Sequence, residues 1–326
     1  MRRAVALAAA LALLAPAAAA AQSPPPAPPP PPPPPAPPPT PQIAMVAKKV
    51  LRAKGEKIVL QRRSFRVLGT VTPAVPGQQV DLAVYRNGKR IRSVRAAVLA
   101  DGTFTRRIRT RRLGRISVVP SHAATPQLGA ATGPKVSVGV VAPRLSDGDS
   151  GTLVRLLQRG LARLRYAVPR NGSFDAATGR AVMAYRKVNG MARRYDADRR
   201  VITRVLAGKG MFQVRHPNAG HHVEADLSRQ VLALIDRGKV VATYHTSTGA
   251  PGTPTVIGSF RVYLKTPGTN AKGMVHSSYF IRGYAIHGYV DVPAFNASHG
   301  CLRIPIPDAS RVFNWLHIGD RVIVYP

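Results

Sequence analysis

The chain has 326 residues, of which 48 are Lys or Arg and 14 are Asp or Glu, so its formal net charge at pH 7 is +34. It contains one cysteine, which excludes a disulfide within the chain. A surface this basic attracts polyanions, and the general candidates are nucleic acid, acidic lipid and the anionic polymers of a bacterial envelope. Codon bias toward Arg is an alternative origin of the charge, but the electrostatic attraction follows in either case.

Residues 1–22 have the pattern of a secretory signal peptide. Arg2 and Arg3 are followed by an apolar run from Ala4 to Leu14 and by small residues that offer an A-x-A type cleavage site. The apolar run is shorter than the roughly 20 residues that cross a bilayer, so no stable membrane span is expected after cleavage. We therefore predict export to the cell wall, the periplasm or the extracellular space, where envelope polymers rank above nucleic acid as partners.

Residues 23–42 are nearly pure proline and predict an extended polyproline II spacer. Residues 43–142 then alternate short apolar runs with turn signals, and the pair Asn87-Gly88 favours a tight hairpin. Short strands at this spacing predict an immunoglobulin-like β-sandwich. His122 lies among Ser, Ala and Thr, so we expect it in an exposed loop. This region holds 20 Lys and Arg against 3 Asp and Glu, and we expect it to attract anionic wall polymers.

Residues 143–210 predict a small domain of three helices. Apolar residues between 153 and 164 recur at helical spacing, and Asp149, Ser150 and Thr152 are available as caps. A second helix is predicted through Val182, Met183 and Tyr185, and a third over "DADRRVITRVLAGKG". The segments "VRLLQRGLARL" and "GSFDAATGRAVMAY" resemble the peptidoglycan-binding domain of the three-helix type. That resemblance implies a wall-binding role, although a purely structural role stays open.

Residues 211–326 are predicted to be mainly β. Alternating apolar residues surround a turn at 236–239, and only "PDASRVFNWLH" has the pattern of a helix, with Pro307 and Asp308 at its start. Trp315 fits the apolar pattern of this helix, so packing explains it. His245 and His276 are interpreted as structural or rim residues.

A metal site was considered for the histidines near the start of this region. His216, His221, His222 and Glu224 lie close together in the sequence. Because adjacent residues of a strand point to opposite faces, we favour a solvated interdomain linker and predict no metal.

The stretch "IHGYVDVPAFNASHGCLRIP" contains the single cysteine, Cys301. A nucleophilic thiol needs a base within hydrogen-bond reach and donors for the oxyanion that forms on a carbonyl. His287 follows an apolar run and is predicted to end a strand, while Gly300 allows a tight turn that aims main-chain N–H groups at one oxygen. These residues predict an acyl-transfer site that uses a cysteine.

The same constellation, "IHGY" followed by "SHGCLR", resembles the catalytic signature of the L,D-transpeptidase family, whose catalytic domain is of the YkuD type. The resemblance spans about 215–326 and implies a β-sandwich-like catalytic domain without a cofactor. It also implies that Cys301 is the nucleophile and His287 the general base. The main chain around His299, Gly300 and Cys301 would form the oxyanion hole, and Ser298 and Arg303 would orient the site. Tyr279 and Phe280 are candidates for capping the substrate pocket.

The reaction implied by the resemblance acts on peptidoglycan stem peptides. Cys301 would attack the bond before the terminal D-residue of a tetrapeptide stem, and the amine of a diamino acid on a second stem would resolve the acyl-enzyme to a 3→3 cross-link. Water or a protein amine could resolve the same intermediate, which leaves carboxypeptidase activity or protein attachment to the wall open. A non-catalytic wall-binding scaffold is disfavoured, because it would have little reason to retain Cys301, His287, His299 and Arg303 together.

Overall fold

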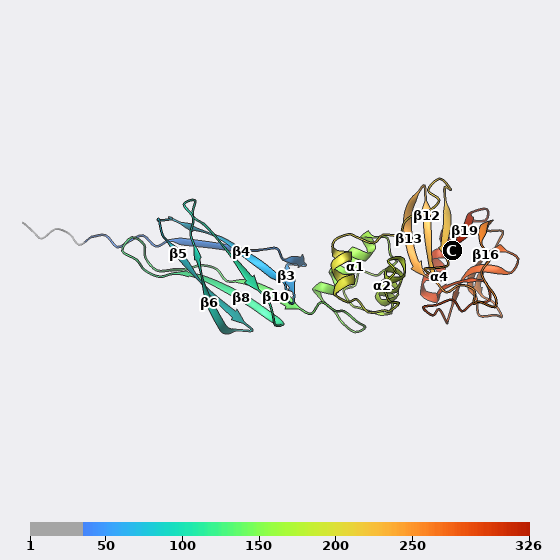
Figure 1. Ribbon diagram of the computed structural model, residues 1–326, viewed down its shortest axis with the longest axis horizontal. Coiled ribbons are helices and arrows are strands. Elements are labelled where there is room, and N and C mark those ends of the chain that lie inside the picture. Colours follow the sequence, from blue (N-terminus) through green and yellow to red (C-terminus); the bar gives the residue numbers. More distant parts are fainter. Residues whose placement is uncertain (1–34) are drawn as a thin grey trace, which may run out of the picture. The chain divides into compact units, whose positions relative to one another are not determined.

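The computed structural model describes residues 35–326, so the predicted signal peptide and most of the proline tract lie outside the described residues. No helix in this described part is long and apolar enough to cross a membrane. The elements are drawn in Figure 1, from ten strands at the N-terminal side through three helices to a β-rich C-terminal region.

Residues 42–141 form two β-sheets that share one hydrophobic core. One sheet has the order β1-β4-β7, and the other has the order β2-β3-β10-β8-β5-β6 with β9 beside β8. The strands are β1 (Gln42–Lys48), β2 (Leu51–Ala53), β3 (Glu56–Leu60), β4 (Ser64–Thr72), β5 (Gln79–Arg86), β6 (Lys89–Ala97), β7 (Thr103–Arg109), β8 (Gly114–His122), β9 (Ala131–Thr132) and β10 (Val136–Val141). In β4, Phe65 and Val67 are buried whereas Arg66 and Leu68 are exposed, which is the alternation that a sheet with one solvated face requires.

The hairpin predicted at Asn87-Gly88 is present between β5 and β6. Both turn residues have positive φ angles, 47° and 85°, which is the geometry that Asn-Gly favours. The expectation for His122 was wrong, because this residue ends β8 with only 5% of its surface exposed. Its Nδ1 lies 3.3 Å from the carbonyl oxygen of Gly129, so the ring is part of the sandwich.

Three helices follow: α1 (Thr152–Arg163), α2 (Ala176–Val188) and α3 (Arg199–Leu206). The side chain of Asp175 caps α2 and that of Asp198 caps α3, each by accepting a hydrogen bond from the backbone N–H three residues on. The caps expected for α1 were wrong, since the N-cap residue of this helix is Gly151, with a φ of 104°, and no side chain caps it.

The helices and the following β-region share buried contacts. The hydrophobic core of α1–α3 continues into β12 (Val231–Asp236) and β13 (Lys239–His245) through Val231, Ala233 and Val240. Lys187 of α2 is 2% exposed, and its Nζ donates hydrogen bonds to the carbonyl oxygens of Gln230 and Thr246 at 3.1 and 2.8 Å. These contacts tie α2 to the β-region directly.

The C-terminal region contains two sheets and one helix. The first sheet has the order β13-β12-β11-β19-β14 and the second the order β15-β16-β17-β18. The elements are β11 (His222–Asp226), β12 (Val231–Asp236), β13 (Lys239–His245), β14 (Gly258–Arg261), β15 (Leu264–Thr269), β16 (Val275–Ile281), β17 (Tyr284–Tyr289), β18 (Leu302–Pro305), α4 (Ile306–Trp315) and β19 (Arg321–Tyr325). The prediction of a mainly β region with one helix is therefore confirmed.

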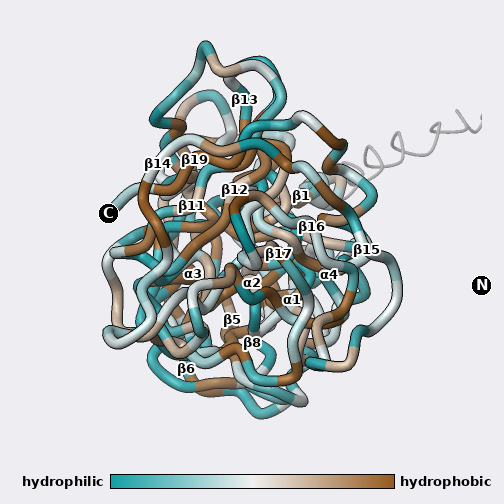
Figure 2. The backbone as a smooth tube through the Cα atoms, turned by 90° about the vertical axis from the view of Figure 1, so that its right-hand side faces the viewer, coloured by the Kyte–Doolittle hydropathy of each residue, from teal (hydrophilic) through white to brown (hydrophobic). Residues whose placement is uncertain are grey.

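A hydrophobic core joins these two sheets and α4. It includes Val223 and Val322 of the first sheet, Ile286 and Leu302 of the second, and Val312 of the helix. Figure 2 shows brown, hydrophobic segments near β12 and β19, in agreement with the buried runs of both strands. At Gly288 of β17 a Cβ atom would come within 2.6 Å of the Ala309 Cβ, so glycine allows α4 to approach this strand.

Candidate active site

The site forms where β17 and β18 pair in parallel. His287 lies opposite Arg303, and Ile286 lies opposite Leu302. Parallel strands need a connection of about a dozen residues, and residues 290–301 provide it. Cys301 directly precedes β18, so the backbone N–H of Ala285 in β17 lies 3.5 Å from its Sγ.

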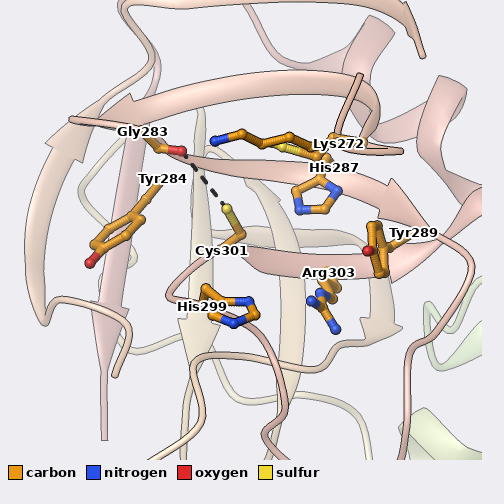
Figure 3. Close-up of a pocket in the computed structure, with 9 residues that line it drawn as sticks. Lys272, Gly283, Tyr284, His287, Tyr289, His299, Cys301 and Arg303 are labelled. Carbon is orange, nitrogen blue, oxygen red and sulfur yellow. Dashed lines mark hydrogen bonds between the residues drawn. The ribbon is translucent and has the colours of Figure 1, made fainter. Parts of the chain in front are cut away.

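A cavity of about 380 Å³ opens over this pairing. Figure 3 shows the Cys301 thiol and the His287 ring on this cavity, with His299 and Arg303 beside them. The residues that line it are Lys272, Met274, Gly283, Tyr284, His287, Tyr289, His299, Cys301 and Arg303. Four of the residues proposed from the sequence therefore share one cavity.

Ser298 holds the turn that carries the thiol. Its Oγ donates to the carbonyl oxygen of Cys301 at 2.6 Å and accepts from the N–H of Gly300 at 3.1 Å. Its own N–H donates to the carbonyl of Thr248 at 2.9 Å, and its carbonyl accepts from the hydroxyl of Thr253 at 3.0 Å. Since Ser298 is only 1% exposed, these bonds are shielded from water and fix the turn.

The glycine in this turn is required for two reasons. Gly300 has a φ of 105°, which strains any residue with a side chain. A Cβ atom at this position would also lie 2.6 Å from the ring of Tyr284. The Gly300 N–H is bonded to Ser298, which differs from the expectation that it would help to hold an oxyanion. The donors that we expect at an oxyanion are therefore the N–H groups of His299 and Cys301.

His287 is arranged as a neutral base. Its Nδ1 lies 2.9 Å from the carbonyl oxygen of Gly288, and because a carbonyl only accepts, Nδ1 carries the proton. The other ring nitrogen, Nε2, is left with a lone pair that can take a proton. Burial lowers the pKa of His287, the Gly288 carbonyl opposes this shift, and the charge of Arg303 adds to it.

The thiol is arranged as a neutral acid. Burial raises the pKa of Cys301, while the N–H of Ala285 and the charges of Arg303 and Lys272 oppose that shift. The Sγ has a weak contact with the carbonyl oxygen of Gly283 at 3.9 Å, drawn in Figure 3. The resting site therefore favours thiol and imidazole over a separated thiolate and imidazolium.

Residues 220–324 match the family model of YkuD, the L,D-transpeptidase catalytic domain. An L,D-transpeptidase structure from Xylanimonas cellulosilytica is 30% identical with a TM-score of 0.51, and the match covers 57% of this chain and 98% of that one. The chain belongs to the L,D-transpeptidase family. An L,D-transpeptidase from Stackebrandtia nassauensis is 21% identical with a TM-score of 0.36, and that match covers 56% and 95% of the two chains. The catalytic domain of the Enterococcus faecium enzyme is 26% identical with a TM-score of 0.29, with 33% and 98% covered. A comparison with curated proteins gives no match.

The L,D-transpeptidase family acts on peptidoglycan peptides and is associated with the cell wall. The match to its family model starts at residue 220, so the β-sandwich and the three helices lie outside it. The predicted identities of those two regions, and the domain boundaries drawn from the sequence, stay predictions.

Two aromatic residues proposed as pocket caps lie elsewhere in the L,D-transpeptidase fold. Phe280 is 3% exposed and packs in the core between the two sheets, with its ring 5.7 Å from that of Phe260. Tyr279 is half-buried and contacts Tyr263 and Asn270. Neither residue lines the cavity.

The solvated linker predicted for the histidines near residue 220 holds for His216, which is exposed, but is wrong for His222 and Glu224. His222 and Glu224 are fully buried in β11. The Glu224 carboxylate accepts hydrogen bonds from His222, from the N–H groups of Arg215 and His216, and from the Tyr325 hydroxyl. Burial raises the pKa of Glu224, but these hydrogen bonds outweigh it and lower the pKa below its ordinary value. This carboxylate therefore has its donors from the protein, while His221 lies apart and stacks on Trp315 at 3.7 Å.

His221 belongs to another group of polar side chains. Among the described residues, only His221, His317 and Asp320 lie close enough together to be considered metal ligands. Asp320 already accepts the N–H of His317 at 2.6 Å, and His221 Nε2 lies 3.1 Å from the carbonyl oxygen of Trp315.

Four side chains that line the cavity were not identified from the sequence, namely Lys272, Met274, Tyr284 and Tyr289. Tyr289 could have been found, because it lies two residues after His287 and so shares its face of β17. The guanidinium of Arg303 lies 4.2 Å from the centre of its ring. Lys272 and Met274 lie in the connection between β15 and β16, and no local sequence pattern places this connection over the thiol.

Proposed function

We propose that this protein is an exported peptidoglycan L,D-transpeptidase that forms 3→3 cross-links through an acyl-enzyme on Cys301. The observation that carries the proposal is the shared cavity of His287 and Cys301 over a turn that Ser298 holds in place. The lone-pair nitrogen of His287 and a neutral thiol are the two partners that general-base attack requires.

The acylation step starts on a tetrapeptide stem. The proton of the Cys301 thiol moves to Nε2 of His287 as Sγ attacks the carbonyl carbon before the terminal D-residue. The N–H groups of His299 and Cys301 hold the oxyanion of the tetrahedral intermediate. When the intermediate collapses, the amine of the D-residue leaves with the proton from His287, and a thioester remains on Cys301.

The second step uses the side-chain amine of a diamino acid on another stem. This amine attacks the thioester carbonyl, its proton passes to His287, and the thiolate leaves to recover that proton as the free thiol. The products are an amide cross-link and the starting enzyme, so the two steps balance without any oxidant or cofactor.

Two neighbouring residues of α2 in the three-helix region have structural contacts. Tyr185 and Arg186 are buried and serve the fold, since the Tyr185 hydroxyl donates to the carbonyl of Lys209 and Arg186 forms an ion pair of 3.0 Å with Asp198. Neither side chain is therefore free to bind the wall.

The proposal is tested with purified protein and tetrapeptide muropeptides, by mass spectrometry of the products. The wild type should release the terminal D-residue and form 3→3 dimers, and Cys301→Ser and His287→Gln should each lose this activity by about a hundredfold or more. Tyr279→Phe, outside the cavity, serves as the matched control and should keep it.

Other outcomes lead to different conclusions. Monomeric tripeptide products alone would show that water resolves the acyl-enzyme, which is L,D-carboxypeptidase activity at the same site. Product formation that does not depend on the thiol would overturn the role of Cys301. As a second readout, we expect a carbapenem to add its mass to the wild type and not to Cys301→Ser.

A further inference from the structure

The β-sandwich carries an arginine-lined surface that the proposed function does not use. Three cavities of about 790, 520 and 320 Å³ open on it. The largest is lined by six arginines, namely Arg62, Arg63, Arg107, Arg109, Arg111 and Arg112.

The three cavities form one continuous surface. The second adds Arg66, Arg92 and Arg106, and the third adds Arg86. Arg109 lines all three cavities. We call the arginines of these three cavities the arginine surface.

The strand register places like charges opposite one another on this surface. Arg66 of β4 pairs with Arg107 of β7 on one side and with Lys48 of β1 on the other. Side chains that are directly opposite in antiparallel strands lie about 5 Å apart, and like charges there destabilise the sheet. A row of three cations therefore carries an electrostatic cost that a bound anion would offset.

No acidic side chain compensates the arginine surface. Asp81 forms an ion pair with Arg95, Asp101 accepts from the N–H and hydroxyl of Thr103, and Glu56 accepts from the hydroxyl of Thr152. These three are the only acidic residues of the region 43–142. Within residues 35–326, none of the arginine-surface guanidiniums forms an ion pair.

One buried donor on this surface also lacks a partner. The Nε of Arg86, which lines the smallest cavity, is buried and has no hydrogen-bond acceptor among the described residues. A buried donor without an acceptor costs about 1–3 kcal/mol.

The lining indicates the chemistry of the ligand. The cations of the cavities are all arginine, whose planar fork binds phosphate and carboxylate with two hydrogen bonds. No aromatic side chain lines them, although aromatic residues typically stack on nucleic-acid bases and anchor proteins at membrane interfaces. We propose that the arginine surface binds a linear polyanion that carries repeated phosphate or carboxylate groups and no nucleobases.

The test measures binding of two labelled polymers to the full-length protein at several NaCl concentrations. Long-chain inorganic polyphosphate and poly-L-glutamate represent the two chemistries, so the polymer that binds more tightly identifies the anion. For the wild type we expect the logarithm of the affinity to fall linearly with the logarithm of the salt concentration. The Arg107→Gln/Arg109→Gln double variant should weaken binding by about tenfold or more at low salt and reduce the slope by about two.

The matched control removes two charges elsewhere. Arg200→Gln/Arg321→Gln changes two exposed arginines of α3 and β19, and its affinity should stay within about twofold of the wild type. Equal weakening in both double variants would show that diffuse charge is responsible and would overturn the proposal. Absence of binding to either polymer at low salt, or tighter binding to phosphatidylglycerol vesicles or to DNA, would overturn it as well.

Discussion

At the scale of single residues, the site combines a raised thiol pKa with a lowered imidazole pKa. Burial drives both shifts, and both favour the neutral form of the group. Arg303 opposes the shift of Cys301 but adds to that of His287. Its charge therefore makes the thiol easier to ionise without making His287 a stronger base.

This arrangement predicts the pH dependence of the reaction. His287 must be neutral to accept the proton, so kcat/KM should rise with pH around a midpoint below the ordinary histidine value of 6.5 and then level off. The rate at which iodoacetamide alkylates the resting thiol should rise with pH around a midpoint above 9.0, because the pKa of Cys301 is raised. The two pH profiles, measured on the same preparation, test whether Cys301 and His287 are both neutral in the resting enzyme. An alkylation rate that has already reached its plateau at neutral pH would instead indicate a preformed thiolate and imidazolium.

Ser298 makes a second prediction at this scale. Ser298→Ala removes the two bonds of the hydroxyl to Cys301 and Gly300 and leaves buried partners unsatisfied, which costs about 1–3 kcal/mol of unfolding free energy. We also expect kcat to fall by about tenfold or more, because the turn that aims the thiol loosens. Thermal unfolding and steady-state kinetics measure both effects.

The chain offers a matched control for Ser298. Ser278 is also about 1% exposed, but its hydroxyl has no hydrogen-bond partner among the described residues. Ser278→Ala removes an unpaired buried hydroxyl, so it should leave kcat nearly unchanged and should raise the free energy of unfolding rather than lower it. If both variants behave alike, the Ser298 hydroxyl does not hold the turn.

At the scale of elements, the sequence correctly predicted those helices and turns that depend on residues close together in the chain. The Asn87-Gly88 hairpin, the three helices and α4 depend on residues within one turn or one period, so their patterns are readable. The burial of His222 and Glu224 was missed because it depends on β19, which pairs with β11 in parallel from about a hundred residues further along the chain. The positions of Lys272 and Phe280 were missed for the same reason, since packing between sheets decides which side chains reach the cavity.

Lys187 gives a prediction about how two elements are held together. Burial, with the charge of Arg193, lowers the pKa of Lys187 to about 7 from 10.5. Between these two values the unfolded chain binds more protons than the folded one, so the contribution of this group to stability rises with pH over that window. Lys187→Met removes the titration. The unfolding temperature of the wild type should therefore rise relative to that of Lys187→Met between about pH 7 and pH 10.

The control for this prediction is a lysine in solvent. Lys239→Met, at the exposed start of β13, should show a constant difference from the wild type over the same pH range. A constant difference for Lys187→Met as well would mean that the pKa of this amine is the same in the folded and unfolded chain, so that burial does not lower it.

At the scale of the whole molecule, half of the net charge of +34 lies in residues 43–142, where 20 Lys and Arg face only 3 Asp and Glu. The catalytic cavity also carries two cations, Lys272 and Arg303, but these face a site that we propose to receive a peptide with a terminal carboxylate. The arginine surface, in contrast, has repeated cations along three cavities that share Arg109. Under the two proposals, the β-sandwich would bind an anionic polymer and the C-terminal region would act on a peptide.

The same charge predicts how salt affects stability. Repulsion among exposed cations is screened as the Debye length falls from about 30 Å at 0.01 M to about 3 Å at 1 M salt, so the unfolding temperature of the wild type should rise when NaCl is added. Arg66→Gln/Arg107→Gln removes two cations that lie directly opposite each other. This variant should be more stable than the wild type at low salt, and its unfolding temperature should rise less with NaCl. The control pair Arg200→Gln/Arg321→Gln should keep most of the salt response. A wild type that loses stability as NaCl is added would show that ion pairs outweigh repulsion, contrary to the register of β1, β4 and β7.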